Sequence, residues 1–192
     1  MGTLKILSWN VNGLGDKIKR GIVSQYLKRL SPNIVLLQET HMMGNMYRAL
    51  DRGGYKMVAH AGYSSGARGV GIMTHKSLPI VIHQIREDPG GRWVAMSATI
   101  RGTRFNIYSI YIPPRLHEQA LLDIGAVLLQ FPAGQTILGG DFNLVADNDM
   151  DRTSNVTHRP RGSPLLEFMD AMGLIDIWRH CNPKAKQFTY HS

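Results

Sequence analysis

Asp141 and Asn143 stand one residue apart after an apolar run and two glycines, in the stretch Thr-Ile-Leu-Gly-Gly-Asp-Phe-Asn-Leu at 136–144. The apolar run is typical of a short buried strand, which we expect to end at Gly139 and Gly140. Asp and Asn beside glycine are also common turn residues, because their side chains hydrogen-bond their own backbone. The pair therefore needs support from elsewhere in the chain before it indicates chemistry.

The same arrangement occurs twice more, near the start of the chain. Asn10 and Asn12 follow the mostly apolar residues 4–9, and Glu39 follows the apolar run at 34–37. One carboxylate, two amides and an Asp-x-Asn pair are suitable partners for one hard divalent cation and one phosphate. Three unrelated turns are a poor explanation for three such strand ends, so we expect them to form one site.

Length and charge set bounds on the function. The 192 residues predict one domain over 1–192, with 43% hydrophobic and 19% charged residues, which is ordinary for a protein with a real core. Lys and Arg exceed Asp and Glu by 22 − 14 = 8, and the pI is near 9.8. This excess favours a polyanionic partner such as nucleic acid, although many basic proteins bind nothing anionic.

Cysteine content and hydropathy bear on location. The single cysteine, Cys181, excludes an intramolecular disulfide. The sequence shows no apolar run near 18 residues and no charged-then-apolar leader, so we expect no membrane span and no secretory signal. We expect an intracellular, nuclear monomer.

The glycines at 66–71 lead into a strand pattern and not into a helix, so we expect no nucleotide cofactor.

The opening of the chain predicts a βαβ unit. Residues 4–9 form the first expected strand, Asp16 is a candidate helix cap, and apolar residues recur at helical spacing from Ile18 to Leu30. The apolar positions of this helix are Ile18, Ile22, Val23, Tyr26, Leu27 and Leu30.

The middle of the chain reads as a β-meander. Five further strands are expected at 55–60, 69–74, 80–86, 93–100 and 104–111, separated by Gly, Pro and Ser clusters. A helix over 118–130 then precedes the strand that leads to Asp141. Ser163 and Pro164 are typical of a helix start, and short core-contacting segments are expected at 174–178 and 188–190. Together these elements predict an α/β fold of two packed sheets with helices on their outer faces.

Four motifs carry a resemblance to a known family, in the family's order and over essentially the whole chain. They are Trp9-Asn-Val-Asn-Gly13, Gln38-Glu-Thr-His41, Tyr108-x-x-Tyr-x-Pro-Pro114 and Gly139-Gly-Asp-Phe-Asn143. The chain resembles the endonuclease/exonuclease/phosphatase superfamily in its exonuclease III and AP-endonuclease branch. Within that branch it is most similar to the N-terminal endonuclease domain of LINE-type (non-LTR) retrotransposons, through the segments at 173–179 and 188–190. The resemblance implies a four-layer α/β sandwich.

The resemblance also implies a metal site. Glu39 would be the main ligand of Mg²⁺, with Mn²⁺ as an alternative, and Asn12 beside it would help to hold the metal and the phosphate. Asp141 would contact the metal and orient or deprotonate the attacking water. For His41 we expect a place in the loop and not a ligand role.

Other positions would contact the substrate. By the resemblance, Asn143 would hydrogen-bond a non-bridging phosphate oxygen, and Tyr111 would lie against the scissile phosphate, although a core aromatic is the alternative for Tyr111. Asn10 is expected to contact phosphate or DNA. Arg159 and Arg161 are candidates for backbone phosphate contacts, with a solvated loop as the alternative.

The chain departs from the family at its C-terminal end. The family's late Asp segment and its Ser-Asp-His segment have no counterpart in these 192 residues. We therefore expect the fold to be incomplete at the C-terminus, and Mg²⁺-dependent DNA phosphodiester hydrolysis to be weak or lost. The alternative is a catalytically inactive retrotransposon-derived remnant that at most binds nucleic acid. A phosphatase on inositol lipids or a sphingomyelinase-like enzyme is less compatible with the retrotransposon-like late segment.

Overall fold

The computed structural model describes residues 3–147, 150–151 and 163–188. The chain divides into two compact units. The first comprises Met1–Ile112 and Gln130–Asp141, and the second comprises Pro113–Leu129 and Phe142–Ser192. One domain over residues 1–192 stays a prediction.

The first sheet belongs to the first unit and has four strands in the order β1-β2-β4-β3. The strands are β1 (Ile6–Asn10), β2 (Ile34–Gln38), β3 (Tyr55–Ala61) and β4 (Val70–His75). β1 and β2 run parallel, whereas β4 is antiparallel to both β2 and β3. The parallel pair is joined by a helix, which confirms the predicted βαβ opening.

The second sheet has four strands in the order β5-β6-β7-β8. They are β5 (Ile80–Glu87), β6 (Trp93–Ile100), β7 (Thr103–Tyr111) and β8 (Gln135–Asp141). β5, β6 and β7 form an antiparallel meander, and β8 adds to β7 in parallel. The five strands expected in the middle of the chain are confirmed, but they divide between the two sheets.

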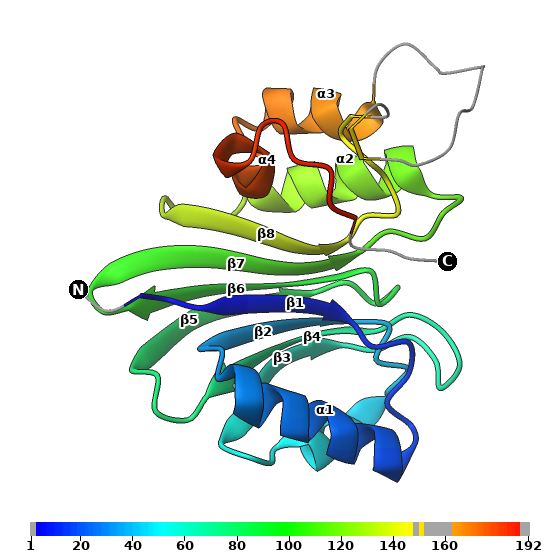
Figure 1. The fold of residues 1–192 in the computed structure, drawn as a ribbon, viewed down its shortest axis with the longest axis vertical. Coiled ribbons are helices and arrows are strands. Elements are labelled where there is room, and N and C mark those ends of the chain that lie inside the picture. Colours follow the sequence, from blue (N-terminus) through cyan, green and yellow to red (C-terminus); the bar gives the residue numbers. More distant parts are fainter. Residues whose placement is uncertain (1–2, 148–149, 152–162, 189–192) are drawn as a thin grey trace. The chain divides into compact units, whose positions relative to one another are not determined.

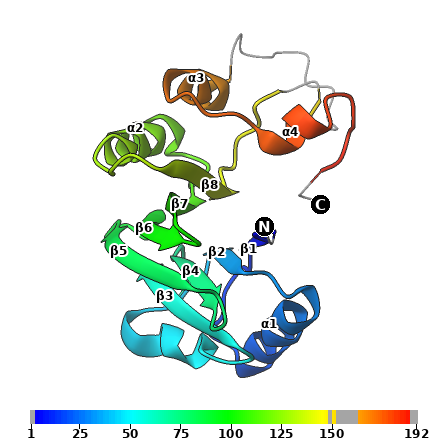
Figure 2. The same cartoon turned by 90° about the vertical axis from the view of Figure 1, so that its left-hand side faces the viewer.

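The two sheets pack face to face within the first unit (Figure 2). Their shared core consists of aliphatic side chains from both sheets, because inward positions alternate with outward ones along each strand. Its buried members are Ile34, Leu36, Ala59, Ala61, Val70, Ile72, Leu78, Val94, Met96, Ala98, Ile100 and Ile107.

A helical layer covers the outer face of the first sheet (Figure 1). It contains α1 (Lys17–Leu30) and the short 3₁₀ helix η1 (Gly44–Leu50), which the sequence pattern did not predict. The Asp16 side chain accepts a hydrogen bond from the Lys19 amide at 2.8 Å, so the predicted cap is confirmed. Two packed sheets with a helical layer confirm the predicted α/β fold.

The apolar face predicted for α1 is only partly correct. Val23 and Leu27 are buried against the sheet, but Ile18 is 75% exposed, and Ile22 and Tyr26 are also exposed. Helical spacing groups all these residues on neighbouring rows, and only a narrow row contacts the sheet. Periodicity therefore located the helix without showing which of its apolar residues are buried.

The second unit contains α2 (His117–Leu128), α3 (Pro164–Ala171) and α4 (Ile177–Cys181). α2 and α3 contact each other, and Pro164 occupies the first turn of α3 as predicted. Ser163 lies at the expected cap position, but its hydroxyl donates to the Val145 carbonyl at 2.5 Å and makes no cap hydrogen bond.

Two short segments near the C-terminal end were expected to contact the core. The expected core-contacting segment at 174–178 is wrong, because Ile175 and Ile177 are exposed where α4 begins. Most of the segment expected at 188–190 lies outside the described residues. In the part of the chain that the structure describes, no helix has both the length and the apolar character that a membrane span requires.

Candidate active site

The carboxyl ends of two parallel strand pairs, one from each sheet, supply the candidate site. In the first sheet β1 and β2 end with Asn10 opposite Gln38. In the second sheet β7 and β8 end with Tyr111 opposite Asp141. β1 and β8 contact each other, so the two edges lie together within the first unit. α/β proteins commonly bind ligands at such strand ends.

The amide of Asn10 joins two carboxylates from different sheets. Its Nδ2 donates to Glu39 Oε1 at 2.9 Å and to Asp141 Oδ2 at 2.8 Å. Its Oδ1 accepts a hydrogen bond from the backbone N–H of Asn12 at 2.9 Å. One side chain therefore fixes both carboxylates and the turn that carries Asn12. Hydrogen bonds to charged acceptors are stronger than neutral ones, which favours a well-defined arrangement.

Two further side chains face Glu39. The Tyr111 hydroxyl hydrogen-bonds the Glu39 carboxylate, and burial, the charge and hydrogen bond of Glu39, and the charge of Asp141 raise the pKa of Tyr111 to about 12. Tyr111 is therefore a protonated donor at neutral pH. His41 Nε2 lies 3.5 Å from Glu39 Oε2. His41 does lie in the loop, as expected, and its ring borders the site.

The loop that carries Glu39 has an unusual backbone conformation. Asn12, Glu39 and His41 have positive φ angles of 44°, 51° and 52°, a region that residues with side chains rarely adopt. Backbone hydrogen bonds hold the two loops together, from Gly13 N to Glu39 O at 2.6 Å and from Leu14 N to Thr40 O at 2.9 Å. Strained backbone that persists is often found at functional sites.

The two glycines before Asp141 lie inside β8, so the prediction that the strand ends at them is wrong. A Cβ on Gly140 would lie 1.9 Å from the Ile110 carbonyl oxygen, and one on Gly139 would lie 2.5 Å from Leu36 Cδ1. Gly140 lets β8 approach its neighbour β7 closely, and Gly139 lets it approach Leu36 of β2 in the first sheet. Their role is close packing and not strand termination.

A buried polar link ties the two sheets together next to the site. The Gln38 amide donates to Ser109 Oγ at 3.1 Å, and that hydroxyl donates to the Leu37 carbonyl at 3.0 Å. Both Gln38 and Ser109 are buried, and leaving either unsatisfied would be costly. The link fixes the position of one sheet relative to the other at the point where Glu39 and Asp141 approach each other.

The β5–β6 hairpin supports Tyr111 from the other side. Buried Asp88 accepts hydrogen bonds from Arg92 Nε at 2.7 Å and from the backbone N–H of Arg92 and Gly90. The Arg92 carbonyl in turn accepts the Tyr111 amide at 2.6 Å. Burial favours the neutral form of Asp88, but the hydrogen bonds and charge of Arg92, with the Gly90 amide, outweigh burial and lower the pKa of Asp88.

This lowered pKa predicts a pH-dependent contribution to stability. The Asp88 carboxylate stabilises the folded state above the ordinary aspartate pKa of about 4, and the stabilisation is lost as the pH falls through the lower folded-state pKa. Asp88→Asn should therefore lower the free energy of unfolding at pH 7, and the difference from the natural chain should shrink below about pH 4. Urea unfolding at several pH values measures this. A difference that stays constant from pH 7 to pH 3 would contradict the role of the charge.

The structure brings together Asn10, Asn12, Glu39, Tyr111 and Asp141. The proposed roles of these residues remain predictions. Asn143 belongs to the second unit, where it has a positive φ of 48°, and its contact with phosphate stays a prediction. Arg159 and Arg161 lie outside the described residues.

Sequence reasoning missed Arg68 as a neighbour of this site. Its positive charge acts on Tyr111, and its carbonyl accepts the His41 amide at 2.9 Å. In sequence, the glycines around Arg68 resemble a nucleotide-binding loop, and the strand pattern after them excludes one. An arginine in a glycine-rich turn between two strands was the available signal, since glycines permit the close packing that places it.

The oxygen donors of the site fit Mg²⁺. In residues 3–147, 150–151 and 163–188, no three His, Cys, Asp or Glu side chains form a group that could hold a metal. Mg²⁺ usually takes one or two protein carboxylates and keeps several waters, and Mn²⁺ accepts similar oxygen ligands. Glu39 and Asp141, joined through one amide, match that requirement. They do not match a structural zinc site, which needs four nitrogen or sulfur ligands.

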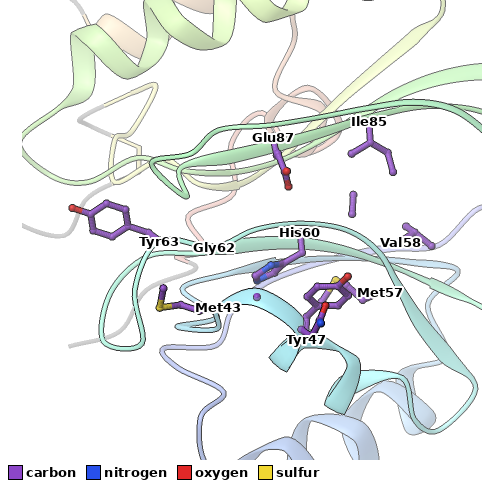
Figure 3. Close-up of a pocket in the computed structure, with 12 residues that line it drawn as sticks. Met43, Tyr47, Met57, Val58, His60, Gly62, Tyr63, Ile85 and Glu87 are labelled. Atoms are coloured by element: carbon purple, nitrogen blue, oxygen red, sulfur yellow. The ribbon is translucent and has the colours of Figure 1, made fainter.

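A separate cavity of about 530 Å³ lies between η1, β3 and β5 (Figure 3). Its walls include Tyr47, His60, Tyr63 and Glu87, and none of the predicted site residues lines it. Burial lowers the pKa of His60 to about 4, so its ring is neutral at pH 7. His60 Nε2 lies 3.2 Å from Thr40 Oγ1. The ring therefore supports the loop after Glu39 from the cavity side.

The sequence is similar to those of two proteins from other organisms. The chain is 26% identical over 192 residues to the transposon TX1 uncharacterized 149 kDa protein of Xenopus laevis, with 97% of this chain and 14% of that protein covered. It is 27% identical over 213 residues to a DNA-(apurinic or apyrimidinic site) endonuclease of Dictyostelium discoideum, with 98% of this chain and 57% of that protein covered. The chain therefore spans only part of both relatives.

A solved structure shows the same fold. An AP endonuclease from Archaeoglobus fulgidus superposes with a TM-score of 0.72 at 20% identity, covering 99% of this chain and 79% of that one. Residues 7–164 match the endonuclease/exonuclease/phosphatase family. This match extends over most of the chain and includes Asn10, Asn12, Glu39, Tyr111, Asp141 and Asn143. The chain belongs to the endonuclease/exonuclease/phosphatase family.

Proposed function

We propose that this chain hydrolyses phosphodiester bonds of DNA in a Mg²⁺-dependent reaction of the AP-endonuclease type. The observation that carries the proposal is the Asn10 amide, which holds Glu39 and Asp141 from two different sheets at one point. Family membership supports a hydrolase of this class. One relative is a transposon protein, and another is a DNA-(apurinic or apyrimidinic site) endonuclease. The formal charge of +8 supports a polyanionic substrate.

Metal binding would fall to Glu39, with Asn12 and Asp141 beside it. A bound Mg²⁺ would supply Lewis-acid stabilisation of the negative charge on the phosphoryl oxygens. The other Glu39 contacts, from Asn10 and Tyr111, orient its carboxylate before substrate arrives. Preorganised groups of this kind lower the reorganisation that the reaction requires.

Proton transfer and phosphate binding would fall to the remaining residues. Asn10 holds Asp141 Oδ2 and so orients the carboxylate that would direct the attacking water and accept its proton. Tyr111 is protonated at neutral pH, and its single hydroxyl proton, which it donates to Glu39 in the free chain, would be donated to the scissile phosphate once substrate is bound. Asn143 would donate to a non-bridging oxygen, in keeping with the family motif.

A defined duplex with one abasic site, compared with the same duplex carrying a normal base, tests the proposal. In Mg²⁺ we expect the abasic strand to be cut adjacent to the lesion, and in EDTA we expect no cutting. Cleavage of both duplexes in Mg²⁺ would support a metal-dependent nuclease and contradict a preference for abasic sites. Intact duplexes in Mg²⁺, from protein shown to be folded by circular dichroism, would contradict the proposal and favour the inactive DNA-binding remnant.

A further inference from the structure

Arg68 is fixed between the two parts of the first unit that border the site. On one side its carbonyl accepts the His41 amide at 2.9 Å, and the Gly69 carbonyl accepts the Thr40 amide at 2.9 Å. These bonds join the Arg68 turn to the loop that carries Glu39. Arg68 has a φ of 56°, so its backbone adopts a conformation that the surrounding contacts must impose.

On the other side the Asp88–Arg92 hairpin holds the Arg68 side chain and turn. Arg68 Nη1 donates to the Gly90 carbonyl at 3.2 Å, and the Gly69 amide donates to the Gly91 carbonyl at 3.1 Å. The approach is close, because a Cβ on Gly91 would lie 2.8 Å from Tyr63 Cβ and 3.2 Å from Gly69 N. The turn at Arg68 and Gly69 is therefore held against a hairpin that is itself stabilised by the partly buried ion pair of Asp88 and Arg92.

The guanidinium of Arg68 is oriented but not neutralised. It stacks on the Tyr63 ring at 4.4 Å from the ring centroid, which fixes its plane. Among the described residues no carboxylate lies within 4.0 Å of it, and its Nε and Nη2 groups have no acceptor there. A planar cation with fixed orientation and unused donors is suited to bind a phosphate through paired hydrogen bonds.

We propose that Arg68 binds a backbone phosphate of the DNA strand, next to the phosphate that is cut at Glu39 and Asp141. This inference rests on the proposed function and names a contact that positions the substrate. Backbone hydrogen bonds join the loop that carries Glu39 to the turn at Arg68 and Gly69. A DNA strand whose backbone is bound by Arg68 is therefore held at a fixed position relative to Glu39. The Asp88–Arg92 hairpin restrains Arg68 before DNA binds, which reduces the entropy lost on binding.

DNA binding in EDTA tests the contact without any cleavage. The natural chain, Arg68→Gln and Arg68→Lys are titrated into a fluorescent duplex at several salt concentrations. Arg101→Gln is the matched control, because Arg101 also has a positive φ, of 50°, but lies in the hairpin at the opposite end of β6. Circular dichroism of each variant is the control for folding.

Arg68→Gln should weaken binding roughly tenfold and lower the slope of log K against log salt by about 0.9, the value for one phosphate contact. Arg68→Lys should keep the slope, and Arg101→Gln should change neither quantity. An unchanged slope and affinity in Arg68→Gln would overturn the inference while leaving the proposed function standing. A natural chain that does not bind DNA would overturn both.

Discussion

Gly140→Ala is expected to lower the free energy of unfolding by about 3 kcal/mol or more, at the upper end of the range for overpacked sites. The new Cβ would lie 1.9 Å from the Ile110 carbonyl oxygen and 2.7 Å from the Ile110 carbonyl carbon. These are backbone atoms in a paired strand, so no side-chain rotation relieves the clash. β8 would have to move away from β7 and would carry Asp141 with it. Urea denaturation followed by circular dichroism measures the loss.

Gly21→Ala is the matched control for this prediction. Gly21 lies within α1, and a Cβ there would meet no atom within 4 Å. Alanine favours a helix over glycine by about 1 kcal/mol, so this variant should be slightly more stable than the natural chain. If Gly140→Ala unfolds at the same urea concentration as the natural chain, close packing of β8 against β7 does not require a glycine at position 140.

Glu39→Gln is expected to lower Mg²⁺-dependent DNA cleavage by at least about 100-fold, since losing even an outer partner of a metal ligand commonly costs 10–100-fold. The substitution keeps the shape of the side chain and an oxygen that can accept from Asn10, but it removes the charge that would hold the metal. Mn²⁺ binding, followed by electron paramagnetic resonance, should weaken in parallel. This second readout does not depend on turnover.

Glu87→Gln provides the control for the charge itself. Glu87 is an exposed carboxylate of the same unit, and it lines the separate cavity between η1, β3 and β5. We expect its replacement to leave both cleavage and Mn²⁺ binding unchanged. Equal loss in Glu39→Gln and Glu87→Gln would show that overall charge, and not a metal site at Glu39, controls the reaction.

Much of the candidate site was predictable because strand ends obey a simple rule. Apolar runs located β1, β2 and β8, and in a parallel pair the carboxyl ends emerge at the same edge. This rule is enough to predict that Asn10 lies near Glu39 at the ends of β1 and β2, and that Tyr111 lies near Asp141 at the ends of β7 and β8. The bridging role of Asn10 was not predictable, since it depends on how the two sheets are stacked, which periodicity does not encode.

The errors have equally specific causes. Gly139 and Gly140 resemble strand-ending glycines in sequence, and only the packing of β8 against its neighbours shows that they belong inside the strand. Ile18 and Ile22 have helical spacing but are exposed, because spacing defines a face and not what covers it. Arg68 could not be assigned, since its position depends on a hairpin about twenty residues further along the chain.

The most direct test of the central claim is a time course of supercoiled plasmid nicking by folded protein, in Mg²⁺ and in EDTA, with Glu39→Gln and Asp141→Asn beside the natural chain. We expect the natural chain to convert supercoiled plasmid to nicked circles only in Mg²⁺, and both variants to lose this activity. Intact plasmid with the folded natural chain, or equal nicking by either variant, would contradict a hydrolytic site built on Glu39 and Asp141.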